Sequence, residues 1–244
     1  MMSPVRNRTH YKNMIRNKKL IKNNKTPRDA SVYPRPISYG MRILLGTPVH
    51  ECKDYAMERW LESVSKLNYP FDLLLIDNSE NPGYVKKLRA YCKKYGITNY
   101  KLLHIDVARD AILDERLARC RELIRREILD KNYDAWFSLE CDVIAPPDAL
   151  SKLVNLIENY WMVSHAYPAR GIPNGTNAEL GISLIKQKAL VRLGFSNEYG
   201  YVNPLLPNSR YGSDVWFIRR IDYASKGKRI SVDGIIKPIY HLSH

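Results

Sequence analysis

Residues 133–150 read YDAWFSLECDVIAPPDAL, a mostly apolar run that stops at an acidic tripeptide and resumes as a helical pattern after two prolines. An aromatic-rich apolar run bounded by breakers predicts a buried strand. Glu140 and Asp142, two positions apart, share one side of an extended backbone. Ligands bind at the carboxyl ends of strands in open α/β sheets, so the pair predicts a Mg²⁺ or Mn²⁺ site. The alternative is an acidic loop that caps the next helix.

The composition is that of a globular protein. A chain of 244 residues fits one domain plus a tail, and 45% hydrophobic and 26% charged residues are ordinary values. No apolar run approaches the roughly 18 residues of a membrane span, so we expect no transmembrane segment and no secretory signal. The four cysteines lack CxxC spacing and predict buried thiols in a reducing compartment. We therefore expect a cytoplasmic protein.

Positive charge is concentrated at the N-terminus. Residues 1–40 contain ten Lys or Arg and one acidic residue, a net charge of +9 out of +14 for the chain. Such a segment cannot bury enough apolar surface to fold alone, which predicts a flexible basic N-terminal arm. The arm would attach the protein to an anionic partner: nucleic acid, a membrane face or another protein. The alternative is a solvated linker without a dedicated partner.

The remainder of the chain alternates strand and helix patterns. Apolar runs predict strands at residues 41–45, 71–76, 100–105, 136–142, 162–166, 182–185 and 229–233. Spacings of three and four predict helices at residues 54–67, 84–95, 108–129, 148–160, 188–193 and 213–226. The βαβαβ order of the first part predicts a parallel sheet of nucleotide-binding type with helices on its faces. The loops at residues 167–181 and 195–211 are candidates for ligand binding.

The acidic stretch resembles the Asp-x-Asp region of GT-A-fold, nucleotide-sugar-dependent glycosyltransferases, in a Glu-x-Asp variant followed by Pro-Pro-x-x-Leu. The resemblance extends over residues 41–244 and rests on the order and spacing of further motifs: GTP at 46–48, IDNS at 76–79, GSD at 212–214, and His241. It implies an α/β GT-A (Rossmann-like) fold with a mostly parallel central sheet flanked by helices. Residues 41–142 would form the nucleotide-binding half and residues 143–244 the acceptor-binding half.

The resemblance also implies a metal site. Asp142 would ligate the cation directly, and Glu140 would contact the ribose or the water shell of the metal. His241 would complete the site, since neutral imidazole is a good ligand for transition-metal ions, with His244 as a substitute. The cation would neutralise the diphosphate that leaves. A structural or solvated role is the alternative for His241.

Asp214 is the candidate catalytic base, which would remove the proton of the acceptor hydroxyl. In similar inverting enzymes a Glu-Asp pair occupies this position, and its Asp is the base. This chain has Ser213 in the first place. The alternative is that Ser213 or Asp214 caps the following helix. A retaining mechanism stays open.

Five further residues are candidates for binding the nucleotide. Asp77 ends the second strand, where similar enzymes contact the nucleobase, although an Asp there could instead start a turn. Thr47, through its backbone, and Pro48 end the neighbouring strand. Arg109 and Arg116, nearest the sheet edge, are candidates for touching the diphosphate. The other arginines of that helix predict a solvated, ion-paired face: Arg121, Arg125 and Arg126.

Three hypotheses follow. The first is a metal-dependent, inverting glycosyltransferase that uses a nucleotide sugar and an unknown acceptor: a glycan, a lipid-linked saccharide, a protein or nucleic acid. The second makes nucleic acid the acceptor, held by the basic arm, and predicts binding that weakens steeply with salt. The third is a non-catalytic relic that binds nucleotide or glycan, which Ser213 favours.

Overall fold

The computed structural model describes residues 40–106, 113–170, 172, 174–177, 179–195, 202–203, 206–210 and 212–243. The contacts divide the chain into Met1–Tyr39 and Gly40–His244, and only the second unit is described below. The predicted basic arm, Arg109 and His244 lie outside the described residues.

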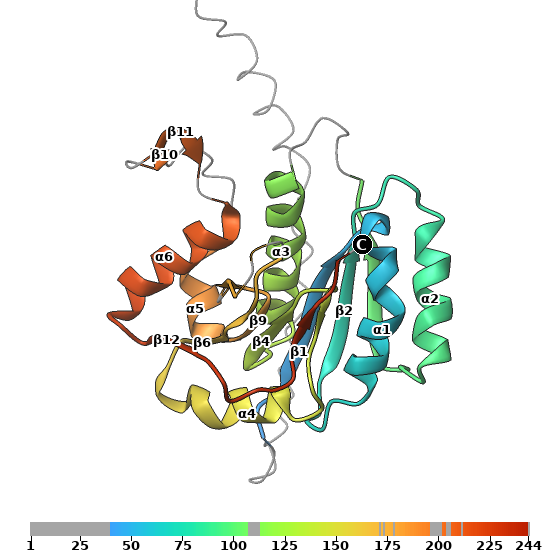
Figure 1. Ribbon diagram of the computed structural model, residues 1–244, viewed down its shortest axis with the longest axis horizontal. Coiled ribbons are helices and arrows are strands. Elements are labelled where there is room, and N and C mark those ends of the chain that lie inside the picture. Colours follow the sequence, from blue (N-terminus) through green and yellow to red (C-terminus); the bar gives the residue numbers. More distant parts are fainter. Residues whose placement is uncertain are drawn as a thin grey trace, which may run out of the picture. The chain divides into compact units, whose positions relative to one another are not determined.

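A seven-stranded sheet forms the centre of the second unit, with the strand order β12-β6-β9-β4-β1-β2-β3 (Figure 1). Its strands are β1 (Ile43–Val49), β2 (Asp72–Asp77), β3 (Tyr100–His104), β4 (Ala135–Leu139), β6 (Met162–His165), β9 (Ile182–Lys186) and β12 (Arg229–Val232). Only β9 among them runs antiparallel to its neighbours, β4 and β6. The predicted α/β fold with a mostly parallel sheet is confirmed.

Helices cover both faces of the sheet. They are α1 (Asp54–Ser65), α2 (Tyr84–Lys94), α3 (Leu113–Asp130), α4 (Ala149–Leu156), α5 (Gln187–Arg192) and α6 (Ser213–Ser225), with 3-10 turns at Glu51–Lys53 and Ile157–Asn159. Successive side chains of a strand point to opposite faces, so Leu45 packs in one apolar cluster with α1, α2 and α4. Leu44 packs in the other cluster, with α3, α5 and α6. Among the described residues, no helix is both long and apolar enough to span a membrane.

Strand β1 is longer than predicted. The expected end at residue 45 was wrong, because β1 continues through Gly46 and Thr47 in register with β2. The Trp136 indole donates a hydrogen bond to the Gly46 carbonyl at 2.9 Å, and Ile124 of α3 lies where a side chain at residue 46 would project. The glycine therefore permits close packing within the strand rather than ending it.

Short strand pairs occupy segments that were expected to be loops. Strand β7 (Tyr167–Pro168) pairs with β8 (Thr176–Asn177), and β10 (Val202–Asn203) pairs with β11 (Leu206–Arg210). These pairs form through backbone hydrogen bonds in polar, proline-bearing segments, which carry no apolar alternation. A further pair joins β5 (Val143–Ile144) to β13 (Tyr240–His241). This last pair brings the C-terminal segment beside the acidic motif.

Candidate functional site

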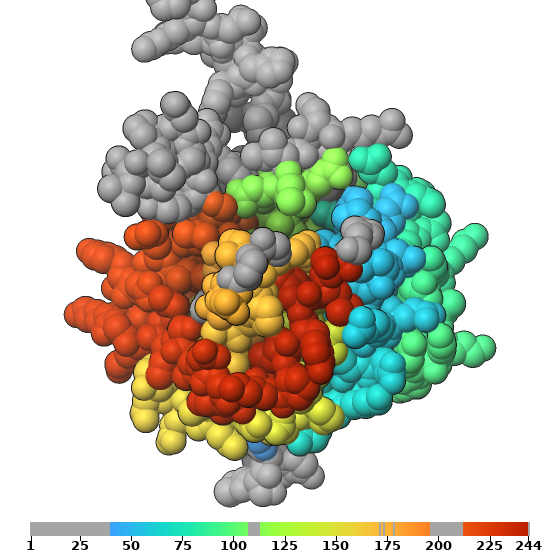
Figure 2. Space-filling model, viewed as in Figure 1, coloured from blue at the N-terminus to red at the C-terminus, as the bar shows by residue number. Residues whose placement is uncertain are grey.

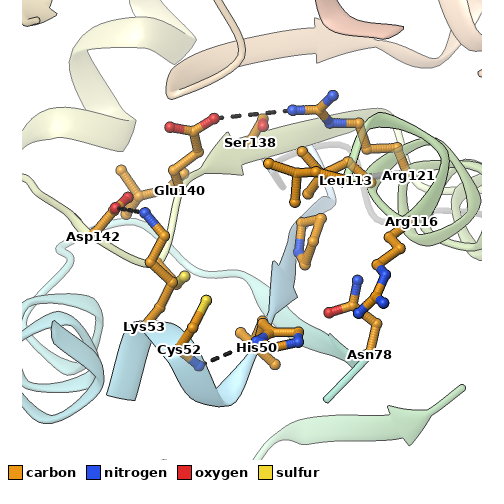
Figure 3. A pocket seen from close by; sticks show the side chains of 15 residues that line it. His50, Cys52, Lys53, Asn78, Leu113, Arg116, Arg121, Ser138, Glu140 and Asp142 are labelled. Atoms are coloured by element: carbon orange, nitrogen blue, oxygen red, sulfur yellow. Dashed lines mark hydrogen bonds and ion pairs between the residues drawn. The ribbon is translucent and has the colours of Figure 1, made fainter. Parts of the chain in front are cut away.

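A cavity of about 460 Å³ lies at the carboxyl ends of β1, β2 and β4, beside the first turns of α3 (Figure 3). This volume is within the range of small-ligand sites, which is about 300–1,000 Å³. The side chains that line it include Pro48, Asn78, Arg116, Arg121, Glu140 and Asp142. The acidic motif thus lies in the cavity wall, at the edge of the sheet where the sequence predicted a ligand site.

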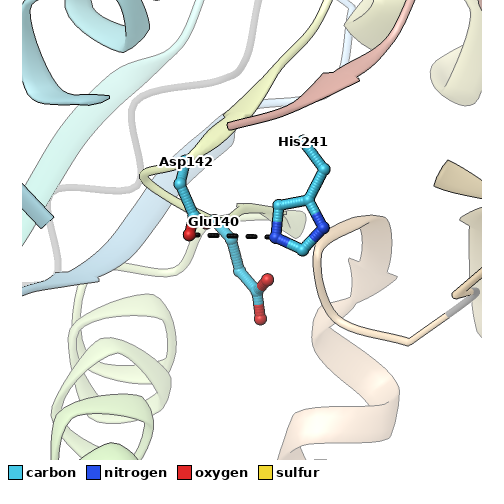
Figure 4. Close-up of side chains that lie close together, drawn as sticks. All are labelled: Glu140, Asp142 and His241. Atoms are coloured by element: carbon cyan, nitrogen blue, oxygen red, sulfur yellow. Dashed lines mark ion pairs between the residues drawn. The ribbon is translucent and has the colours of Figure 1, made fainter. Parts of the chain in front are cut away.

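The three predicted metal ligands come together. Glu140, Asp142 and His241 each offer one ligand atom, and these atoms all lie within 4.8 Å of one another (Figure 4). Strand β13 brings His241 to the two carboxylates, because His241 pairs with Val143 of β5. The backbone N–H of Leu242 then donates a hydrogen bond to the Asp142 carbonyl at 2.8 Å. In the space-filling view the red C-terminal segment lies between α1, in blue and cyan, and the orange segment that includes β7 (Figure 2).

The imidazole of His241 is oriented as a metal ligand would be. Its Nδ1 lies 2.9 Å from the Pro168 carbonyl oxygen, and its Nε2 lies 3.8 Å from Asp142 Oδ2. A carbonyl only accepts, so Nδ1 carries the hydrogen and Nε2 keeps its lone pair. Metal-bound histidines are commonly held in this way by a backbone carbonyl. The donor set of two carboxylates and one such imidazole therefore fits a divalent cation.

Two cationic side chains lie on Asp142. Lys53 Nζ donates to Asp142 Oδ2 at 2.5 Å, and Arg170 donates to the same oxygen while its Nη2 lies 3.0 Å from His241 Nε2. Burial is the largest influence on Asp142 and opposes its charge, but Lys53 and Arg170 outweigh burial and hold the pKa of Asp142 below its usual value. A positively charged nitrogen thus already lies between two of the predicted metal ligands.

Arg121 faces the site, contrary to the prediction of a solvated face. Only 4% of its side chain is exposed, and its Nη1 donates to Ser213 Oγ at 2.9 Å. Its Nη2 lies 3.9 Å from Glu140 Oε1 and 3.8 Å from Asp214 Oδ2. The sequence does carry a signal for this position, since residue 121 lies four residues after Leu117 and three before Ile124, on the stripe that α3 buries.

The remaining arginines of α3 differ from one another. Arg116 lines the cavity, and its Nη2 lies 3.6 Å from Glu80 Oε1. Arg125 was expected to be solvated, but its Nε donates to the backbone carbonyls of Leu190 and Leu193, which joins α3 to the end of α5. Arg126 is exposed and paired with an acid on its own helix, as predicted.

Asp214 lies at the start of α6 with 21% of its side chain exposed. The helix is capped by Gly212 without a side-chain hydrogen bond, so the alternative that Ser213 or Asp214 is the N-cap was wrong. Ser213 is engaged elsewhere, because its N–H donates to Asp114 Oδ1 at 2.6 Å and its hydroxyl accepts from Arg121.

Desolvation raises the pKa of Glu140 above its usual value, and the negative charges of Asp142 and Asp214 add to this while Arg121 opposes it.

Solved structures resemble this architecture at low sequence identity. A mannosyltransferase from Pyrobaculum calidifontis in complex with GDP-Man and Mn²⁺ is 17% identical, with a TM-score of 0.59 over 86% of this chain and 59% of that one. Glucosyl-3-phosphoglycerate synthase from Mycobacterium tuberculosis is 14% identical, with a TM-score of 0.53 over 84% and 73% of the two chains. TarS from S. aureus is 12% identical, with a TM-score of 0.55 over 79% and 35%. The chain has the GT-A fold.

The likeness is one of fold, and it confirms the resemblance noted in the sequence. No model of a known protein family matches the chain, and no curated protein matches it either. The chain spans 59% of the length of the mannosyltransferase. Function must therefore be argued from the site of this GT-A domain itself.

Two predicted nucleotide contacts have buried side chains in this GT-A domain. Thr47 is fully buried, and its hydroxyl donates to the Leu139 carbonyl at 2.8 Å, which ties β1 to β4. Asp77 is also fully buried, and its Oδ1 accepts from the N–H and hydroxyl of Ser79 while its Oδ2 lies 2.8 Å from His104 Nδ1. Neither side chain reaches the cavity wall, whereas Pro48 does. The carboxylate of Asp77 holds the turn that begins there.

The structure adds functional residues that the sequence did not indicate. Lys53 and Arg170 contact Asp142 across large separations in the chain, from the turn after β1 and from the segment between β7 and β8. Burial, together with the negative charges of Asp214 and Glu140, raises the pKa of Glu179, before β9, to about 7. No local spacing connects these residues with the acidic motif, so the sequence offered no signal for them.

Proposed function

We propose that the protein is a metal-dependent, inverting glycosyltransferase that moves a sugar from a nucleotide-diphosphate donor to an acceptor hydroxyl. One observation carries the proposal: Glu140, Asp142 and the lone pair of His241 converge within 4.8 Å beside a cavity of donor size. Two carboxylates and an imidazole suit Mn²⁺, and Mg²⁺ with more water in its shell. The GT-A fold of the chain, which it shares with a mannosyltransferase, also favours this chemistry.

The donor would bind along the carboxyl ends of β1 and β2. Arg116, at the cavity wall, would take the diphosphate, and Arg109 is its proposed companion. Pro48 and the backbone of Thr47 would contact the nucleoside. Asp77 would contribute to binding of the nucleobase indirectly, because it accepts a hydrogen bond from the Ser79 N–H and so fixes the turn that contains Asn78. Asn78 lies in the cavity wall. The cation held by Asp142 and its partners would stabilise the charge of the leaving diphosphate.

Asp214 would serve as the general base. As the acceptor oxygen bonds to the anomeric carbon, the bond from that carbon to the phosphate oxygen breaks, and its electron pair leaves with the diphosphate. The hydroxyl proton passes to the carboxylate of Asp214, which a general base can accelerate by about 10²–10⁴-fold. Attack on the face opposite the leaving group gives inversion. The guanidinium of Arg121, 3.8 Å from Asp214 Oδ2, would help to hold this carboxylate in place.

The first experiment is thermal denaturation with a panel of nucleotide diphosphates and nucleotide sugars, with and without Mn²⁺. A ligand that binds the native state raises the melting temperature by mass action. We expect a metal-dependent rise with one nucleotide that disappears in Asp142→Ala. Asp148→Ala is the matched control, since Asp148 lies on the same segment and pairs with Lys152 outside the cavity. A panel without any shift contradicts the proposal.

A second candidate, a non-catalytic relic that binds nucleotide or glycan, has two observations in its favour. Arg170 lies between Asp142 and His241, and a serine precedes Asp214. This candidate predicts donor binding without turnover. Release of nucleotide diphosphate that vanishes in Asp142→Ala would eliminate it.

The acceptor class is open, and residues 1–40 make nucleic acid one candidate because of their net charge of +9. Cytoplasmic location, with this segment at an anionic surface, stays a prediction from the sequence.

A further inference from the structure

The C-terminal segment, residues 233–241, carries His241 from the edge of the sheet to the acidic motif. It leaves β12 and, in Figure 1, runs past α4 and then upward beside α1. Its far end is held by β13, which pairs with β5. Within the described part of the chain, residues 233–239 make no backbone–backbone hydrogen bond. The course of this stretch is therefore fixed by contacts with side chains.

His165 of β6 makes one of these contacts from inside the protein. Only 1% of the residue is exposed, and its Nε2 accepts a hydrogen bond from the Ile236 N–H at 3.0 Å. Its Nδ1 lies 2.6 Å from the Ala166 carbonyl oxygen. A carbonyl only accepts, so Nδ1 carries the hydrogen and Nε2 offers its lone pair to Ile236. Both ring nitrogens thus have a partner, and the ring is held in one orientation.

The other contacts of the stretch hold it less completely. The side chain of Ile236 is buried in the apolar cluster that includes α1, α2 and α4. Lys152 of α4 donates to the Ile235 carbonyl at 2.9 Å, but its side chain is 34% exposed, so water can replace this bond. A cavity of about 540 Å³ is lined by β7, β8 and residues 236–239. Close packing is absent there, which leaves the buried hydrogen bond to His165 to fix the backbone.

A change at Ile236 reaches the metal site along the chain. His241 follows Ile236 by five positions, and its imidazole must lie beside Glu140 and Asp142 to complete the site. Without the acceptor on His165, the Ile236 N–H would be buried and unpaired, which is unfavourable enough to move the backbone toward water. Ligands of a metal tolerate displacements of only about 0.5 Å, so such a movement would weaken the site.

We propose that His165 is a positioning residue for the metal site: by accepting the hydrogen bond of Ile236, it fixes the segment that places His241 beside Glu140 and Asp142. The proposal rests on the proposed function, since it assigns the site a cation. His165 does not act as a ligand here, because its ring nitrogens are engaged with Ala166 and Ile236. It acts through the fraction of molecules in which His241 is in place, and the apparent Kd for the metal rises as this fraction falls.

The test compares two amides that each reproduce one of the two ring nitrogens. His165→Gln extends an acceptor to the position of Nε2, whereas His165→Asn reaches only the position of Nδ1 and leaves Ile236 without a partner. For Asn we expect an affinity for Mn²⁺, measured by calorimetry, that is about tenfold weaker than in wild type, and for Gln one within about threefold. Binding of nucleotide diphosphate without metal should be unchanged in both.

Amide hydrogen exchange of metal-free protein, followed by NMR, reads the position of the segment directly. The amides of Ile236 and Leu242 should exchange about tenfold faster in His165→Asn than in wild type and at nearly the wild-type rate in His165→Gln. Tyr133→Phe is the matched control, because it removes another hydrogen bond of a buried side chain, to Asp72 at 2.7 Å, and Tyr133 does not line the cavity at the acidic motif. Its affinity for Mn²⁺ should equal that of wild type.

Several results would overturn the positioning role alone. They are wild-type affinity and exchange in a folded His165→Asn protein, an equal loss in His165→Gln, or an equal loss in Tyr133→Phe. Rapid exchange of the Ile236 amide in the wild type would also overturn it, without any variant. A wild-type protein that binds no divalent cation, with or without nucleotide, overturns the proposed metal-dependent function instead. Exchange in the two His165 variants then still shows whether this histidine holds the segment.

Discussion

Arg170 should compete with the metal for Asp142. Its guanidinium donates to Asp142 Oδ2, and its Nη2 lies 3.0 Å from His241 Nε2, between two proposed metal ligands. A divalent cation that binds there must displace this group. Arg170→Ala should therefore tighten the binding of Mn²⁺ to the protein in the absence of nucleotide.

The size of the effect follows from the exposure of the ion pair. A hydrogen bond to a charged group contributes about 1.5–3 kcal/mol when sheltered. The side chain of Arg170 is 39% exposed, so solvent screening reduces its share to about 1 kcal/mol. Because about 1.4 kcal/mol corresponds to a tenfold change in affinity, we expect binding about fivefold tighter. Lys53 stays on Asp142 at 2.5 Å in the variant, so the competition is reduced rather than removed.

Isothermal titration calorimetry of Mn²⁺ into metal-free protein measures this affinity directly. Arg126→Ala is the matched control, since Arg126 is an exposed arginine of α3 whose ion pair is with Glu122. Its Mn²⁺ affinity should equal that of wild type. An unchanged or weaker affinity in Arg170→Ala would refute the argument, because the guanidinium would then not occupy the position of the cation.

Three further outcomes are expected. Thr47→Val removes the hydrogen bond to the Leu139 carbonyl at nearly constant volume, which should cost about 1 kcal/mol in urea unfolding and leave the donor-induced rise in melting temperature intact. The pKa of Glu179 is raised to about 7 in the folded protein, whereas an unperturbed glutamate has a pKa of about 4.3. Its contribution to the stability of the folded state is therefore complete below about pH 4.3 and is lost as the pH rises through about 7. The melting temperature of Glu179→Gln relative to wild type should therefore increase between pH 5 and pH 8, and a constant difference would contradict the raised pKa. If the acceptor is nucleic acid held by residues 1–40, deletion of these residues should abolish binding to it and leave donor hydrolysis intact, whereas unchanged binding by the truncated protein contradicts that role of the segment.

The fold was predictable because local patterns and topology agree. Buried strands appeared as apolar runs, the helices as spacings of three and four, and their order predicted a parallel sheet. Glu140 and Asp142 could be found because both follow directly from the end of β4. His241 came from a resemblance, and its approach to them depends on the two-residue strands β5 and β13. Pairing of that length leaves no periodicity in a sequence.

The charged partners of the site were less predictable. Arg121 was assigned to a solvated face because acids are interleaved with the arginines of α3, although its spacing from Leu117 places it on the buried stripe. Spacing along a helix was in this case a better guide than charge. Arg170 and Glu179 reach the site from the segment between β7 and β9, and only tertiary packing brings them there. The sequence marks that segment as a loop, with no indication of which side chain points inward.

The charges of the site explain why cation and donor should bind together. Among the described residues, four carboxyl groups lie around the acidic motif: Glu140, Asp142, Glu179 and Asp214. The cationic side chains there are Lys53, Arg121 and Arg170, and Arg116 lies in the wall of the same cavity. A divalent cation alone adds two positive charges and must displace Arg170. A nucleotide-diphosphate sugar carries two negative charges, so the cation and the donor together leave the net charge of the site unchanged. Once displaced, the guanidinium of Arg170 can contact a phosphate. Mn²⁺ should therefore bind more tightly in the presence of the donor, and by linkage the donor should bind more tightly with Mn²⁺ by the same factor.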